Sequence, residues 1–193
     1  PVTVGEAFSD LECKNGKTLN HDIENAQLSN KLDLKRLKRI PEGSGIRYQK
    51  DEQKYLPPSL RFYIDWETIR EKRFRQTKFQ RLDRTKPSPT IMTHRHGYFH
   101  PVQPRYLTQR EAAKCQSFPN NFEFCGPISA QWRQIGNAVP PLLGKAIGKA
   151  LLKMFKEAKD NSFKSVKPNK KRILERIYQR RKEAFIYKEP KAT

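Results

Sequence analysis

The chain has 193 residues, of which 40 are lysine or arginine and 20 are aspartate or glutamate, giving a formal net charge of +20. Hydrophobic residues make up 35% and charged residues 31%, which predicts one domain with a modest core and an extension outside it. A positive surplus of this size favours a polyanionic partner such as nucleic acid, although a solvated basic surface has the same composition. The sequence contains no apolar run of about 18 residues and no signal peptide, so we expect an intracellular protein without a membrane partner.

The three cysteines, Cys13, Cys115 and Cys125, lack the spacing of a metal site, and no metal is expected. Their odd number predicts free thiols in a reducing compartment. The chain begins with Pro1 rather than methionine, so we expect either a processed start or a fragment of a longer protein.

In the first half, short apolar segments alternate with proline and glycine breaks. Residues 5–11 carry apolar side chains on one side, which predicts a helical turn. Residues 31–40 place leucine and isoleucine at intervals of three, which predicts a short basic helix that ends at Pro41. Aromatic and basic residues then interleave from 60 to 82, and residues 70–86 hold eight basic and two acidic side chains.

The second half contains two predicted helices. Thr108 and Glu111 form a capping-box pattern for a helix at 109–116. A second helix starts at Pro140–Pro141, where proline is tolerated because the first N–H groups have no partner within the helix. Its apolar residues recur every three or four positions as far as Met154, so we expect this helix to be packed.

Outside these helices the patterns are weaker. Residues 90–100 predict two short extended segments joined by an exposed turn at 94–97. Residues 153–193 carry 14 basic and 5 acidic side chains, with an expected linker at 156–169 and an expected basic helix at 170–185. The interpretations of this tail remain open: it wraps DNA, contacts a protein partner, or forms a solvated extension.

Two stretches of the second half carry the most specific pattern in the chain. They are residues 105–119, RYLTQREAAKCQSFP, and residues 131–141, QWRQIGNAVPP. In this order and at this separation they resemble motifs IX and X of the DNA cytosine-5 methyltransferases. Arg110 and Glu111 match the Arg-Glu pair of motif IX, which in that family organises the target-recognition region and performs no chemistry. Gln134 and Gly136 match fixed positions of motif X.

Residues 134–137 are expected to form an exposed polar turn ahead of the C-terminal helix. Such a turn offers backbone N–H groups and an amide to a small zwitterion, but from the residues alone an ordinary strand-to-helix turn explains it more simply. In the resembled family this block lines the S-adenosyl-L-methionine pocket, and Asn137 and Ala138 fall on the cofactor-contacting positions. The resemblance therefore implies S-adenosyl-L-methionine as the cofactor, bound by Gly136, Asn137 and Ala138.

Residues 81–93, RLDRTKPSPTIMT, resemble the end of the variable target-recognition region of bacterial family members. Thr90 and Ile91 fall on the family's pair of a threonine and an aliphatic residue, which contacts DNA near the displaced base. The predicted turn that follows supplies three candidate donors for base edges or phosphates: His94, Arg95 and His96. The alternative is an exposed polar loop with no partner.

The catalytic cysteine of the resembled family is not found. Those enzymes add a cysteine thiolate to C6 of a flipped-out cytosine, and that cysteine directly follows a proline. Here Glu12, Lys114 and Phe124 precede the three cysteines. The family's glycine-rich cofactor loop, its Glu-Asn-Val segment and its Gln-x-Arg-x-Arg block are also not seen. We therefore predict no catalytic residue in this chain, which alone should be inactive.

The resemblance implies an α/β fold: a small mixed target-recognition domain plus the C-terminal helix of a Rossmann-like S-adenosylmethionine-dependent methyltransferase domain that is mostly absent from this chain. We expect a DNA-reading region at 1–104, a motif IX and X segment at 105–152 that packs on the catalytic domain, and a basic extension at 153–193. The implied location is the bacterial cytoplasm, in association with the nucleoid.

The implied function is that of the C-terminal part, or the small subunit, of a DNA cytosine-5 methyltransferase in a restriction–modification system. It methylates C5 of cytosine in a specific duplex sequence. The implied partners are double-stranded DNA and either the missing N-terminal catalytic portion or a separate catalytic subunit. Two alternatives remain, a non-catalytic basic DNA-binding module derived from such an enzyme and a decayed gene product without function.

Overall fold

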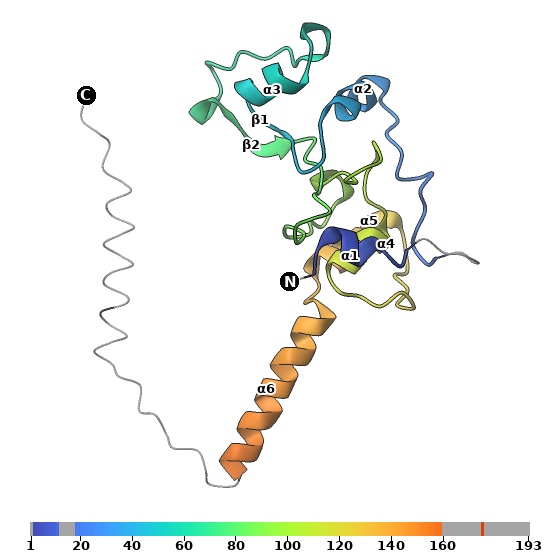
Figure 1. Cartoon of the computed structure of the whole chain (residues 1–193). Coiled ribbons are helices and arrows are strands. Elements are labelled where there is room, and N and C mark those ends of the chain that lie inside the picture. Colours follow the sequence, from blue (N-terminus) through green and yellow to red (C-terminus); the bar gives the residue numbers. More distant parts are fainter. Residues whose placement is uncertain (1, 12–17, 160–174, 176–193) are drawn as a thin grey trace. The chain divides into compact units, whose positions relative to one another are not determined.

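The computed structural model of the protein describes residues 2–11, 18–159 and 175 (Figure 1). They fall into two units, residues 1–146 and residues 147–193. The first unit contains the candidate cofactor residues at 136–138 and the candidate DNA-binding residues between 90 and 96. The basic helix predicted at 170–185 lies, apart from residue 175, outside the described residues.

Three short helices surround the larger hydrophobic core of the first unit: α1 (Val4–Phe8), α4 (Gln109–Cys115) and α5 (Ile128–Asn137). Figure 1 shows them side by side. We call this core 1, and its buried members are Val4, Leu82, Ile91, Leu107, Ala112, Ala113, Phe118, Phe124, Trp132 and Ile135. Core 1 draws residues from both sides of residue 104, so the expected DNA-reading region and the motif IX and X segment share one core.

The local helix signals of the sequence are confirmed. Thr108 and Glu111 form a complete capping box: the Thr108 hydroxyl accepts from the Glu111 N–H, and the Glu111 carboxylate accepts from the Thr108 N–H. The predicted basic helix is α2 (Lys31–Arg39), capped by the Asn30 side chain. The helical turn expected at 5–11 is α1, which starts one residue earlier and has its own capping box.

A smaller core, core 2, lies beneath a two-stranded antiparallel sheet that the sequence did not predict. Strand β1 (Ile46–Tyr48) pairs with β2 (Arg73–Lys78), with Ile46 opposite Lys78 and Tyr48 opposite Arg73. Helix α3 (Gln49–Tyr55) and the 3-10 turns η1 (Pro58–Leu60) and η2 (Arg70–Lys72) complete this region. Core 2 consists of Ile40, Ile46 and Leu56, covered by Tyr55, Leu60, Phe62, Phe74 and Phe79. The mixed α and β composition of the expected fold is confirmed.

Four stacked aromatic rings connect core 2 to the segment that carries motif IX. Phe62 stacks on Phe79 at 6.1 Å, Phe79 on Phe99 at 5.6 Å, and Phe99 on Tyr106 at 4.9 Å between ring centroids. Aromatic stacking of this kind adds about 1 kcal/mol per pair beyond area burial. The stack therefore holds the hairpin and the residues near 99–106 in one arrangement.

Two predicted features look different in the structure. The segments at 90–93 and 98–100 form no strands, and isolated bridges join Phe99 to Arg81 and to Tyr106 instead. The predicted helix after Pro140 exists as α6 (Pro141–Lys159), but its apolar face is uncovered within this chain, so its packing on a catalytic domain stays a prediction. Its large apolar side chains are exposed: Leu142, Leu143, Ile147, Leu151, Leu152, Met154 and Phe155. Within the described residues, no helix is both long enough and apolar enough to cross a membrane.

Candidate functional site

A buried ion pair organises the start of motif IX. Arg105 donates to both carboxylate oxygens of Glu111, at 2.9 and 2.7 Å, and both side chains are almost fully buried. Burial alone would raise the pKa of Glu111, but hydrogen bonds from Arg105 and its positive charge hold that pKa below its usual range. Because Glu111 also caps α4, one carboxylate joins the helix start to the segment before it.

Arg110 is fully buried and ties α4 to two distant loops. Its guanidinium donates to the carbonyls of Leu19, Pro119 and Phe122 and to the side-chain oxygen of Asn20. These acceptors come from segments about 90 residues before and about 10 residues after it in the sequence. These contacts give Arg110 a structural role, because a guanidinium can donate several N–H groups to separate carbonyls.

The structure corrects the turn expected at 134–137. These residues form the last turn of α5, and the chain leaves the helix only at Ala138. The helical period continues because Trp132 and Ile135, three residues apart, are both buried in core 1. A helix C-terminus presents carbonyls rather than free N–H groups, so the backbone donors expected here for a zwitterion are engaged within the helix.

The structure explains the glycine at position 136 by close packing, which the sequence alone did not indicate. A Cβ built at this position would lie 2.7 Å from the backbone of Met92 and of Thr93. The side-chain amide of Gln116 donates to the Ile135 carbonyl, and that of Gln134 donates to the Cys125 carbonyl at 3.0 Å. Helix α5 is thus pressed directly onto the end of the segment proposed to meet DNA.

We expect Gly136→Ala to lower the free energy of unfolding by about 1–3 kcal/mol, because the added methyl group meets backbone atoms that cannot rotate away. Urea unfolding followed by circular dichroism measures this loss. Gly144→Ala in α6 is the matched control, since a Cβ there meets nothing within 4 Å. Equal stability of the two variants would contradict the assigned packing.

The candidate cofactor residues at the end of α5 differ in exposure. The side chain of Asn137 is exposed and makes no hydrogen bond with another described residue, whereas Ala138 is half-buried against core 1. A free amide beside a fixed methyl group fits one wall of a pocket for a polar organic cofactor. The other walls are not formed by these residues.

The structure separates the two residues of the Thr90–Ile91 pair. The side chain of Thr90 is exposed, whereas Ile91 is 6% exposed and belongs to core 1. The Ile91 side chain is therefore not available for the DNA contact expected of it, and Thr90 alone keeps that candidate role. The burial of Ile91 anchors the backbone that presents Thr90.

The loop with His94, Arg95 and His96 is anchored to Tyr106. It contains the 3-10 turn η3 (Arg95–Gly97). The Arg95 guanidinium lies 4.9 Å above the Tyr106 ring and donates to Asn25, and His96 Nδ1 lies 3.3 Å from the Tyr106 hydroxyl. Burial and the charge of Arg95 lower the pKa of His96, so at neutral pH this ring is uncharged. Tyr106 ends the aromatic stack, which makes it the loop's link to core 2.

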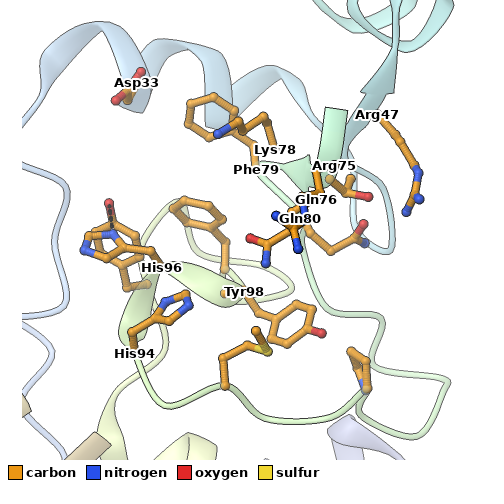
Figure 2. Close-up of a pocket in the computed structure, with 16 residues that line it drawn as sticks. Asp33, Arg47, Arg75, Gln76, Lys78, Phe79, Gln80, His94, His96 and Tyr98 are labelled. Carbon is orange, nitrogen blue, oxygen red and sulfur yellow. Dashed lines mark hydrogen bonds between the residues drawn. The ribbon is translucent and has the colours of Figure 1, made fainter. Parts of the chain in front are cut away.

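The same loop separates two hollows. The larger, hollow 1, has a volume of about 710 Å³ and lies between the β1–β2 hairpin and the loop (Figure 2). The smaller, hollow 2, has a volume of about 540 Å³ and is closed on the other side by α5. His94 and His96 line both hollows, and Arg95 lines hollow 2. The predicted loop is thus brought together with residues of the hairpin that the sequence did not single out, among them Arg47, Arg75 and Gln76.

The two cysteines in the described part of the chain do not resemble an activated nucleophile. Burial raises the pKa of the Cys115 thiol to about 12, so this group is protonated at neutral pH. Cys125 is exposed, and neither cysteine follows a proline.

Comparison with solved structures gives the class of fold. A crystal structure described as a DNA modification methyltransferase encoded within an E. coli prophage superposes with a TM-score of 0.52 at 22% sequence identity. The match covers 81% of this chain and 48% of that chain. The fold is therefore shared with part of that protein.

The family follows from the sequence itself. The profile of the C-5 cytosine-specific DNA methylases matches residues 3–153, and the chain belongs to this family. DNA (cytosine-5)-methyltransferase 1B of Oryza sativa subsp. japonica is 37% identical over 169 residues, covering 81% of this chain and 11% of the relative. Type II methyltransferase M.NgoFVII of Neisseria gonorrhoeae is 32% identical over 162 residues, which cover 81% of this chain and 37% of that relative.

Type II methyltransferase M.AquIB of Picosynechococcus sp. aligns differently. It is 42% identical over 87 residues, which cover 38% of this chain but 61% of that relative. The chain thus spans from about a tenth to three fifths of the length of these three relatives.

Proposed function

We propose that this chain is the DNA-reading and motif IX and X part of an S-adenosyl-L-methionine-dependent DNA cytosine-5 methyltransferase. It acts in a restriction–modification system, on C5 of cytosine within a specific duplex sequence. The catalytic cysteine and most of the cofactor pocket belong to an N-terminal portion or to a separate subunit. M.AquIB supports the second arrangement, because most of that relative consists of the aligned region.

The observation that carries this proposal is the contact between Gly136 and the backbone at Met92–Thr93. This contact supports the proposal because it holds the end of α5, which carries the candidate cofactor residues Asn137 and Ala138, against the segment that continues from the candidate DNA residue Thr90. Methyl transfer requires donor and acceptor to be held within about 3–3.5 Å of each other, so the two binding segments must adjoin. Bound S-adenosyl-L-methionine would supply the electrophilic methyl group, and the Asn137 amide would help to hold the cofactor.

The exposed apolar face of α6 fits the same proposal. Seven large apolar side chains along one helix are costly to leave in water, at about 25 cal/mol per Å². We propose that this face packs on the catalytic portion and that Gln134, Arg110 and Glu111 keep the preceding segments in place for it.

The test combines the purified chain with its catalytic portion and measures methylation of duplex DNA. We expect no methylation by the chain alone. In the combined enzyme, we expect Asn137→Ala to raise the KM for S-adenosyl-L-methionine about tenfold, because one buried polar contact to the cofactor contributes about 1.4 kcal/mol. Replacing His94 and His96 with alanine should lower sequence discrimination and change that KM less.

Asn121→Ala is the matched control for Asn137→Ala, because Asn121 is an exposed asparagine away from both hollows. A KM equal to that of the control would remove Asn137 from the cofactor site. Retained DNA binding without methylation alongside any catalytic portion would favour the non-catalytic module instead.

A further inference from the structure

Most arginine side chains in the described part of the chain are held by the protein itself. Arg36, Arg61, Arg81 and Arg110 donate to backbone carbonyls, and Arg73, Arg84 and Arg105 pair with glutamates. Four described arginines have side chains that make no hydrogen bond, ion pair or ring contact with another described residue: Arg39, Arg47, Arg75 and Arg133.

Three of these four arginines line the hollows beside the loop at 94–96. Arg47 and Arg75 line hollow 1, and Arg133 lines hollow 2. Figure 2 shows Arg47 and Arg75 with Gln76 and Gln80 on the hairpin side of hollow 1, and His94, His96 and Tyr98 on the loop across from them. The acidic residue of this lining, Asp33, is already paired with Arg36 at 3.1 Å. Hollow 1 therefore has an unbalanced positive wall.

The wall is held rigidly. Arg47 lies on β1 and Arg75 on β2, two paired strands. Next to Arg75, Phe74 packs edge-on against Phe62 at 5.6 Å and against Trp66 at 4.9 Å, which anchors β2 to core 2. Phe79, just after β2, continues the aromatic stack that reaches Tyr106 and the loop.

The geometry of the hairpin fits one polyanion in particular. The major groove of B-DNA admits a two-stranded β-ribbon, and β1–β2 is such a ribbon. Arginine pairs bidentately with guanine and glutamine with adenine, while a further arginine neutralises a phosphate. Arg75 and Gln76 are both exposed and both line hollow 1, so a duplex that enters this hollow reaches both side chains.

We propose that the β1–β2 hairpin is a second DNA-reading element, which faces the loop at 94–96 across hollow 1. Arg75 and Gln76 contact base edges and determine part of the recognised sequence, and Arg47 contacts a phosphate. This inference rests on the proposed function and adds specificity-determining residues that lie outside the resembled motifs.

The test uses the whole chain and a pool of duplex DNA with a randomised central segment. Each variant is then titrated into two labelled duplexes, one with the sequence that the unchanged chain enriched and one with a scrambled sequence. Fluorescence anisotropy measures the affinity for each duplex. Arg75→Ala should weaken binding to the enriched duplex at least about tenfold and to the scrambled duplex about threefold, which lowers the ratio between them. Gln76→Ala should lower the ratio in the same direction, and Arg47→Ala should weaken both affinities equally.

Arg39→Ala is the matched control, because Arg39 is also exposed and unpartnered among the described residues but lines neither hollow. It removes the same charge and should weaken both affinities less than about threefold. The side chains changed here are at the surface, so thermal unfolding should be the same for all variants. If Arg75→Ala and Gln76→Ala behave like Arg39→Ala while loop variants at His94 and His96 change the ratio, the hairpin assignment is wrong and the proposed function stands. If the unchanged chain enriches no sequence, the hairpin assignment and the proposed DNA-reading function are both wrong.

Discussion

Replacing Arg110 with alanine is expected to lower the free energy of unfolding by roughly 4 kcal/mol, a large part of the stability of a small domain. The guanidinium is 0% exposed and satisfies three backbone carbonyls and the Asn20 side chain. Alanine removes all four hydrogen bonds and leaves a cavity where a fully buried side chain stood, while the Pro119 carbonyl and the Asn20 oxygen keep the N–H groups of Phe122 and Phe124 as donors. Urea unfolding followed by tryptophan fluorescence measures the loss.

Arg110→Lys separates charge from geometry. Lysine keeps the positive charge but cannot direct separate N–H groups at carbonyls on two loops, so most of the loss should remain. Arg39→Ala provides the baseline for removing an exposed arginine. A loss below about 1 kcal/mol for Arg110→Ala would mean that the loops around Leu19 and Phe122 hold together without it.

The parts of the fold that sequence predicts well are those set by neighbouring residues. The capping box at Thr108 and Glu111 needs only three residues of separation, and the basic helix α2 needs only a period of three with Pro41 after it. Both formed as predicted, because no distant segment competes with the local signal.

The parts that sequence did not predict depend on distant contacts. A glycine followed by asparagine is a common turn signal, yet residues 134–137 stay helical because Trp132 and Ile135 are buried in core 1 and Gly136 must fit against Met92–Thr93. The burial of Ile91 has the same origin. No local pattern gives the packing of two segments more than 40 residues apart.

The hairpin was missed for a related reason. Strands β1 and β2 lie 24 residues apart and their pairing is short and irregular, so neither has the alternation that predicts a strand. The interleaved aromatic and basic residues between 60 and 82 were the available signal. In the structure Phe62, Phe74 and Phe79 of that stretch cover core 2, and its unpartnered arginine, Arg75, lines hollow 1.

The second large effect concerns pH. His100 lies beside the buried pair Arg105–Glu111, with its Nε2 3.8 Å from a Glu111 oxygen, and its Nδ1 accepts N–H groups from Val102 and Gln103 at 3.1 and 2.8 Å. Burial, together with the charges of Arg105 and Arg81 and against the opposing charges of Glu111 and Glu42, lowers the pKa of His100 from 6.5 to about 4. The native state therefore holds this ring neutral where the unfolded chain would protonate it.

Stability should consequently fall as pH is lowered from about 6.5 to about 4, because the unfolded state binds the additional proton throughout that window. The shift corresponds to about 3 kcal/mol over the whole window, and His21, whose pKa burial also lowers, adds to it in the same direction. Urea midpoints measured at several pH values between these limits give the slope.

His100→Asn is the matched variant. An asparagine side-chain oxygen can accept the Val102 and Gln103 N–H groups as Nδ1 does, but it does not titrate. The variant should keep most of the stability at neutral pH and lose the larger part of the slope below about pH 6.5, leaving the contribution of His21. If the variant keeps the slope of the unchanged chain, another group causes the acid sensitivity. The Arg105–Glu111 pair is then the next to replace, because the lowered pKa of Glu111 also makes stability fall as the pH decreases through that pKa.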